Sequence, residues 1–183
     1  MPTPIEQLQA EHRVIEKALR ALGGLSQRLE RGETVDPACF ERLFDFLTAF
    51  ADGRHHHKEE QCLFPALGLR GMPRDRGPVG VMLQEHCTGR ALIAHMRRAV
   101  TALANGDAKA KRQFADAARN YIDLTSEHIQ KEDQVLFRLA SQLLDEQAMH
   151  QLRDDFDQAE AGFAEDPSRY KQEAEELERA LAV

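Results

Sequence analysis

The chain has 183 residues, of which 42% are hydrophobic and 30% charged, and its three cysteines form no CxxC pair. This composition excludes a disordered chain, which would lack the apolar residues to bury a core, and it gives no sign of a disulfide scaffold. The net charge of −7 argues against a nucleic-acid binder. No apolar run approaches the roughly 20 residues that span a bilayer, and the polar start shows no secretion signal. We therefore expect one cytoplasmic domain with neither nucleic acid nor a membrane as partner.

The charge is divided unevenly along the chain. Residues 145–183 hold 12 acidic and 4 basic residues, whereas residues 1–144 are close to neutral. We interpret 1–144 as the main domain and 145–183 as an acidic helical extension packed on it, with its charges on a solvated helical face. A protein partner would bind through this extension. The sequence leaves open whether the chain is a monomer or a homodimer.

Residue usage and boundary signals predict helices throughout. Val, Ile and Thr are sparse, whereas Ala, Leu, Glu, Gln, Arg and Lys dominate, which favours helix over strand. A capping box, Thr3-Pro4-Ile5-Glu6, begins a first helix that ends near Gly32. A second helix, capped at Asp36, runs to about Gly71, and a loop rich in glycine and proline follows.

Four further helices complete the predicted fold. The third ends at Asn105, and the fourth, capped at Asp107, carries apolar residues at helical spacing as far as Leu139. A fifth helix begins at Asp145 and a sixth at Asp166. Four long helices joined by short or moderate loops are typical of an all-α, antiparallel up-down-up-down bundle. The last two helices form the C-terminal extension along its outside.

The sequence repeats itself after 73 or 74 residues. Residues 55–64 can be laid on residues 128–137, where His, Lys, Glu, Gln, Leu and Phe coincide, and the segment around His12 matches the segment around His86. The bundle is therefore expected to consist of two helical hairpins of the same design. Each hairpin contributes one lone histidine and then one His-x-x-x-Glu motif.

The spacing of these motifs has a chemical consequence. Residues four apart on a helix lie above one another on one face, so His55 with Glu59, and His128 with Glu132, can each reach one point beside the helix. On a wheel of about 100° per residue, the first pair continues the apolar face of the second helix. The second pair continues the apolar line of the fourth.

An alternative register would use His56 with Glu60. We choose the pair one residue earlier, because Glu60 falls about a quarter turn from the apolar face and matches only an aspartate in the repeat. We expect His56 and His57 to face solvent, with a role for His56 next to the ligands as the exception.

A metal site explains why so many polar groups should point at the bundle axis. Burying unpaired carboxylates costs several kcal/mol each, and divalent cations remove that cost. Six nitrogen and oxygen donors exceed what one tetrahedral zinc uses and suit two octahedral ions, iron or manganese rather than copper(I). The expected metal ligands are His12, His55, Glu59, His86, His128 and Glu132.

The donors divide naturally between two ions. If His12 and His55 serve one ion, and His86 and His128 the other, both glutamates can bridge the pair together with an oxo or hydroxo group. One position per ion then remains open for a small diatomic ligand or peroxide.

The order of these motifs resembles the hemerythrin-like, or HHE cation-binding, family over about residues 3–140. The segments 58–65 and 85–90 also resemble the family around its ligands. The resemblance implies a four-helix bundle with two iron ions, with manganese or a mixed pair as the less favoured alternative. Oxygen carriers of this family have a further histidine where this chain has Arg90, and a final aspartate five residues after the last histidine, where Glu132 stands four residues after it. The resemblance is therefore to bacterial members that respond to O2 or NO.

Three functions remain in competition. The favoured one is a non-haem di-iron protein that binds a small diatomic ligand, O2 or NO, for sensing, storage or stress response. The second is an enzyme that decomposes peroxide or reduces NO. The third is an iron-responsive regulatory module whose acidic C-terminal helices report metal binding to a partner.

Overall fold

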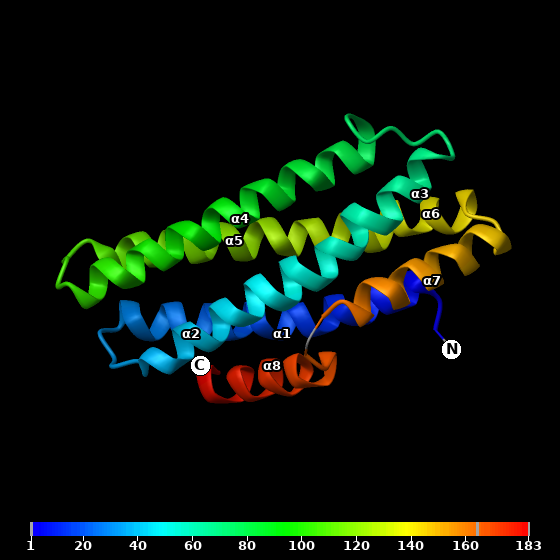
Figure 1. Cartoon of the computed structure of the whole chain (residues 1–183). Helices are drawn as coiled ribbons and strands as arrows, with labels where there is room; N and C mark the ends of the chain where they lie inside the picture. The colour runs from blue at the N-terminus through cyan, green and yellow to red at the C-terminus, as the bar shows by residue number, and fades with distance from the viewer. Residues whose placement is uncertain (1, 164, 183) are drawn as a thin grey trace.

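The chain forms six continuous helices in a computed structural model that describes residues 2–163 and 165–182 (Figure 1). Two of the long helices change their hydrogen bonding along their length, so that α-helical and π-helical segments follow one another without a break. The segments are α1 (Pro4–Glu30), α2 (Pro37–Asp45), η1 (Phe46–His56), η2 (Glu59–Leu63), α3 (Phe64–Gly68), α4 (Gly77–Ala104), α5 (Ala110–Lys131), η3 (Glu132–Leu136), α6 (Phe137–Leu143), α7 (Glu146–Ala161) and α8 (Pro167–Leu181).

The local signals at the helix starts are confirmed. The Thr3 hydroxyl accepts a hydrogen bond from the Glu6 backbone N–H at 3.1 Å, and the Glu6 carboxylate accepts one from the Thr3 N–H at 2.7 Å. This reciprocal pair satisfies two of the free N–H groups at the start of α1. Side-chain caps also begin α2, α7 and α8, at Asp36, Asp145 and Asp166.

Two boundaries differ from the prediction. The second long helix ends at Gly68, a turn earlier than expected, and α5 begins at Ala110 rather than directly after Asp107. The Asp107 carboxylate still accepts a hydrogen bond, at 2.9 Å from the Lys109 N–H. It therefore holds the turn that precedes the helix rather than its first residue.

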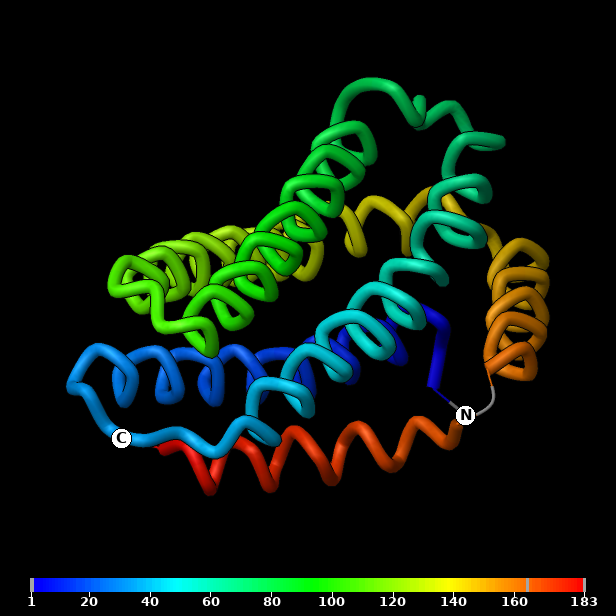
Figure 2. Tube along the Cα trace, turned by 60° about the vertical axis from the view of Figure 1, so that its left-hand side comes forward, coloured from blue at the N-terminus to red at the C-terminus, as the bar shows by residue number. Residues whose placement is uncertain are grey.

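The four long helices alternate in direction, as an up-down-up-down bundle requires (Figures 1 and 2). Their buried apolar residues fall into two clusters, one toward each end of the bundle. On α1, Leu8 belongs to one cluster and Ile15 to the other; on α4, Met82 and Ile93 divide in the same way. A layer of buried histidines and carboxylates separates the clusters.

The two C-terminal helices cover the side of the bundle that α1 and the second long helix form (Figure 2). From α8, Tyr170 and Leu177 join the apolar cluster of α2 and η1, whereas Leu152 and Phe156 of α7 join the other cluster. Both helices therefore extend the hydrophobic core. Within residues 2–163 and 165–182, none of the helices is long and apolar enough to cross a membrane.

The acidic residues of α8 differ from the expected solvated face. Several of them pair with basic side chains of the bundle, which neutralises both surfaces where they meet. The pairs are Glu175 with Lys17 at 2.7 Å, Glu178 with Arg20 at 2.5 Å, and Glu173 and Glu176 with Arg42 at 3.1 and 2.8 Å.

Candidate metal centre

The layer between the two apolar clusters contains all six side chains that the sequence analysis selected. Each is buried, and every long helix contributes at least one of them. Together with His56, their donor atoms form two groups; within each group all atoms lie within 4.8 Å of one another, and Glu59 belongs to both. The first group is His12, His55, Glu59 and Glu132, and the second is His56, Glu59, His86 and His128.

Both glutamates lie between a histidine of one half and a histidine of the other. Glu132 Oε2 is 3.1 Å from His12 Nε2 and 3.3 Å from His128 Nε2. Glu59 presents Oε1 to His55 Nε2 at 3.6 Å and Oε2 to His86 Nε2 at 3.4 Å. Each carboxylate is therefore placed to span the two halves of the bundle, as a bridging ligand would.

Several of the inward-facing atoms make no hydrogen bond within the protein. His55 Nε2, both oxygens of Glu59 and Glu132 Oε1 are buried without a hydrogen bond. Unpaired buried polar atoms are rare in folded proteins because each loses its hydration without compensation. A divalent cation accepts lone pairs from both imidazole nitrogen and carboxylate oxygen, so this set of orphaned atoms fits a pair of metal ions.

The other nitrogen of each histidine is fixed by a carboxylate. All four Nδ1 atoms lie 2.8–3.0 Å from a carboxylate oxygen, which leaves the Nε2 lone pair for the centre of the layer. This arrangement is typical of metal-binding histidines. The pairs are His12 with Asp133, His55 with Glu11, His86 with Glu60 and His128 with Glu85.

These outer carboxylates were present in the repeat, but the sequence analysis gave them no role. Glu11 and Glu85 directly precede a lone histidine, whereas Glu60 and Asp133 directly follow the glutamates of the two motifs. Their matched positions in the two halves were the signal that could have identified them. Each is in turn paired with a cation: Lys58 with Glu11, Lys131 with Glu85, Arg90 with Glu60, and Arg13 with Asp133.

The electrostatics of the layer favour positive charge at its centre. Burial disfavours protonation of His12, but hydrogen bonds to Asp133 and Glu132 outweigh it and raise the pKa of His12 to about 9. Burial also acts to lower the pKa of His128, but the negative charge of Glu132 and hydrogen bonds outweigh it and raise the pKa to about 10. Burial dominates at His55 and lowers its pKa to about 3. The buried carboxylates therefore stabilise positive charge at the centre of the layer.

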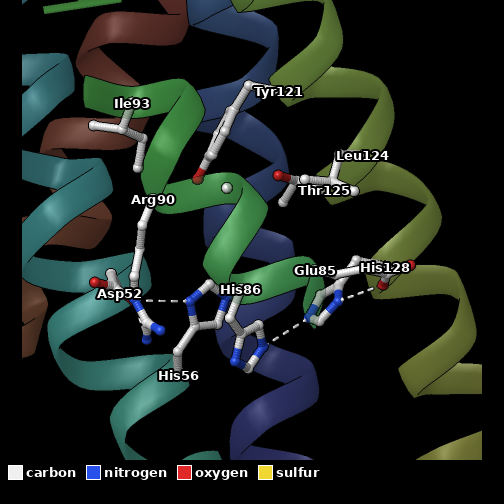
Figure 3. A pocket seen from close by; sticks show the side chains of 11 residues that line it. Asp52, His56, Glu85, His86, Arg90, Ile93, Tyr121, Leu124, Thr125 and His128 are labelled. Carbon is white, nitrogen blue, oxygen red and sulfur yellow. Dashed lines mark hydrogen bonds and ion pairs between the residues drawn. The ribbon is translucent and has the colours of Figure 1, made fainter. Parts of the chain in front are cut away.

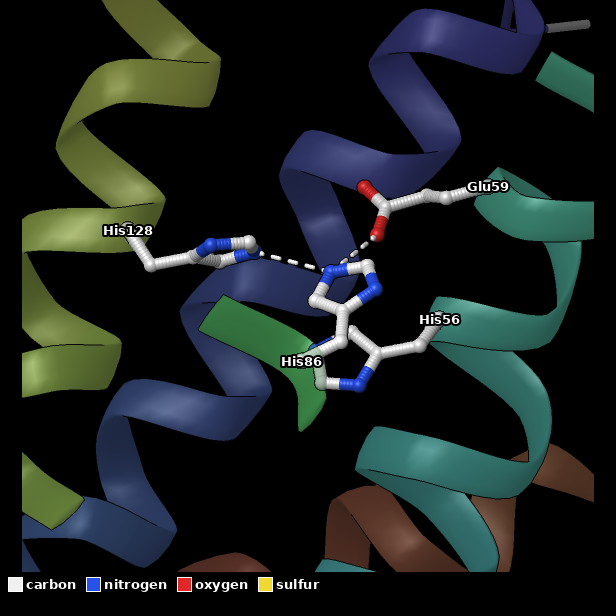
Figure 4. A group of neighbouring side chains, drawn as sticks. All are labelled: His56, Glu59, His86 and His128. Atoms are coloured by element: carbon white, nitrogen blue, oxygen red, sulfur yellow. Dashed lines mark hydrogen bonds and ion pairs between the residues drawn. The ribbon is translucent and has the colours of Figure 1, made fainter. Parts of the chain in front are cut away.

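The expectation that His56 faces solvent is wrong. Its side chain is only 13% exposed, and its ring stacks on that of His86 with a centroid distance of 3.8 Å and an interplanar angle of 18° (Figure 4). The wheel assumed α-helical spacing, whereas η1 is π-helical and has more residues per turn, so neighbouring side chains are separated by a smaller angle. His57, by contrast, is exposed as expected.

A small pocket adjoins His86 and His128 (Figure 3). Its inner volume of about 10 Å³ is close to the least room that one water molecule needs. Polar side chains line one part and apolar side chains another. The lining includes Asp52, His56, Arg90, Ile93, Tyr121 and Leu124.

Arg90 and Tyr121 line this pocket, and the structure shows the contacts of Arg90, which could not be predicted from the sequence. The Arg90 guanidinium donates to Asp52 at 2.8 Å and to Glu60 at 2.7 Å, and so pairs with neither Glu59 nor Glu132. Tyr121 is buried, which raises the pKa of its hydroxyl and keeps it protonated. The pocket therefore offers a neutral hydroxyl and a paired guanidinium beside the histidine layer.

Comparisons with known proteins give a family match and three relatives. A family model described as the hemerythrin HHE cation-binding domain matches residues 3–140. Three uncharacterized proteins, one from Mycobacterium bovis and two from strains of Mycobacterium tuberculosis, are each 28% identical to this chain over 135 residues. The match covers 74% of this chain and 52% of each relative, so the chain spans about half the length of the curated relatives it matches. No solved structure gives a significant match.

Proposed function

Because this chain belongs to the hemerythrin HHE cation-binding family, we propose that its bundle holds two iron ions that share an oxo or hydroxo bridge. The observation that carries this proposal is the set of buried, orphaned donor atoms on His55, Glu59 and Glu132. Manganese has the same preference for imidazole and carboxylate, and metal analysis distinguishes it from iron.

The side chains divide between the ions by their positions. His12 and His55 would hold one ion, His86 and His128 the other, and the two glutamates would contact both. The outer carboxylates keep each ring in the tautomer whose Nε2 faces inward, and they increase the basicity of that nitrogen. Bound iron would supply open coordination positions and a change of redox state, which the side chains alone lack.

The function that we assign to this centre is the binding of a small diatomic ligand, O2 or NO, for sensing, storage or stress response. Two features of the chain support it. The candidate donors are buried in the middle of the bundle, and the pocket beside them is small, with an inner volume of about 10 Å³, which favours a small ligand. Apolar side chains such as Ile93 and Leu124 on the pocket wall suit an uncharged diatomic molecule.

Metal analysis and gas titration test the proposal. Protein purified aerobically should contain about two iron ions per chain and absorb in the near ultraviolet as oxo-bridged pairs do. Titration of the reduced protein with NO or O2 should change this spectrum until it saturates. A Glu59→Ala variant is the control, because it should lose the metal and the response together. Iron-free protein from iron-replete cells, or no response to either gas, would refute the proposal.

One contact favours a second function, that of an iron-responsive module. Lys58 joins Glu11, the carboxylate that contacts His55, to Glu160 on α7 at 2.6 Å. Loss of iron from His55 would therefore disturb Glu11 and Lys58 and weaken the contact with α7. Amide hydrogen exchange in α7 should be faster in the metal-free protein than in the loaded protein. Equal protection in both forms would exclude this second function.

A further inference from the structure

The four histidines selected from the sequence share one arrangement of neighbours. In each, Nδ1 faces a carboxylate, and that carboxylate is paired with a lysine or an arginine. The same arrangement holds in the second half, around His86 and His128. Such outer partners fix the tautomer and the orientation of a metal-binding ring, so the arrangement can be used to search for further ligands.

His56 has this arrangement in full. Its Nδ1 lies 3.2 Å from Asp52 Oδ1, and the same oxygen accepts a hydrogen bond from Arg90 at 2.8 Å. Nδ1 is thereby engaged outward, which leaves Nε2 as the nitrogen available to a metal. The neighbouring His57 is exposed, and its ring contacts that of Phe163 on the surface instead.

The position of His56 matches its arrangement of neighbours. One of its donor atoms lies within 4.8 Å of donor atoms from Glu59, His86 and His128 (Figure 4). Its ring stacks on His86 and lies edge-on to His128 at a centroid distance of 5.8 Å. The ring also lines the pocket beside the layer.

We infer that His56 is a fifth histidine ligand, the third nitrogen donor to the ion that His86 and His128 hold. This inference rests on the proposed function, since it requires two ions in the layer. The centre would then be asymmetric, with three nitrogen donors for the ion near His56 and two for the ion between His12 and His55.

The second half of the repeat cannot supply an equivalent ligand. At the offset of 73 residues, His56 corresponds to Ile129, which is buried in the apolar core, and Asp52 corresponds to Thr125. The second half also lacks a π-helical stretch like η1 before its His-x-x-x-Glu motif, because α5 is α-helical as far as Lys131. The two halves therefore differ at this position both in sequence and in helix geometry.

A pair of neighbouring substitutions tests the inference. His56→Ala should release one of the two ions, or bind the second at least about tenfold more weakly, whereas His57→Ala should bind both ions as the unchanged protein does. Metal content and competition with a chelator measure this. In iron-57-loaded protein, Mössbauer spectra should show two distinct iron environments, which His56→Ala should alter and His57→Ala should not.

A measurement on the unchanged chain keeps the test independent of whether His56→Ala folds. Each metal-bound histidine keeps an Nδ1–H proton, which a paramagnetic ion shifts strongly in the NMR spectrum. The Co²⁺-loaded protein should give five such exchangeable signals. Four signals, or a folded His56→Ala variant with unchanged affinity and spectra, would overturn the inference while leaving the two-metal centre intact. An unchanged protein that binds no pair of ions would instead refute the proposed function as well.

Discussion

The two halves of the bundle arise from one repeat, yet they lie in different surroundings. Lys58 of the first half is fully buried and contacts Glu11 and Glu160, because α7 covers it. Its counterpart in the second half, Lys131, contacts Glu85 and is 41% exposed. The inward-facing donors and their outer carboxylates nevertheless match. The comparison teaches that the donors of the layer and their outer carboxylates follow the repeat, whereas the burial of the outer lysine depends on the C-terminal helices.

The largest effect is expected where the halves are equivalent. Glu59→Ala and Glu132→Ala should each abolish loading of both ions, because each carboxylate spans the two halves. The iron content per chain measures this, with helical content by circular dichroism as the folding control. If either variant retained one full equivalent of iron, that glutamate would serve a single ion and the halves would not be equivalent.

The next effect should distinguish the halves. Lys58→Met leaves two carboxylates without their buried partner and should cost about 3–5 kcal/mol in the free energy of unfolding of the metal-free protein. The matched change Lys131→Met removes an exposed pair and should cost about 1 kcal/mol or less. Urea denaturation measures both. Equal losses would mean that α7 does not shield the first half in solution.

A smaller effect is expected at Glu60 and Asp133, the outer carboxylates that occupy equivalent positions in the two halves of the repeat. Asp133→Asn and Glu60→Gln should each weaken metal binding by about 10–100-fold, because the ring of His12 or His86 loses its anionic partner. Competition with a chelator measures the affinity. Glu127→Gln is the control, since this side chain is exposed next to His128. An unchanged affinity in Asp133→Asn would show that Asp133 does not orient the ring of His12.

The smallest effect is the pH dependence of the ion pairs between α8 and the bundle. A hydrogen bond from Lys17 lowers the pKa of Glu175 below its ordinary value of 4.5, and Gln172 and Arg42 lower that of Glu176. Their contribution to stability is therefore present above about pH 4.5 and is lost as the pH falls through the lowered values. Hydrogen exchange in α8 should accelerate before that in α4 on acidification. Simultaneous loss of protection would contradict this order.

Local signals made most of the fold predictable. Helix caps such as Thr3 and Asp145 depend on residues within one turn, so they can be recognised directly in the sequence. The spacing of four in the His-x-x-x-Glu motifs likewise determines a helix face, which is why the six selected side chains lie together in the structure. Their role as metal ligands stays a prediction that loading experiments decide.

Features that depend on tertiary packing or on unusual helix geometry were not predictable in this way. His56 contacts the layer because η1 has π-helical hydrogen bonding, and no residue preference in the sequence predicts a π-helix at this place. The burial of Lys58 depends on Glu160, about a hundred residues later in the chain. The ion pairs of α8 could not be assigned before the side of the bundle that it covers was known.

The polar layer divides the hydrophobic interior into two separate clusters, one toward each end of the same four long helices. Each end therefore has its own source of apolar stabilisation. Substitutions that fill or empty space near Phe114 at one end, or near Leu144 at the other, can be absorbed locally. In such a bundle, the apolar residues at the two ends can change during evolution while the donors in the middle stay the same.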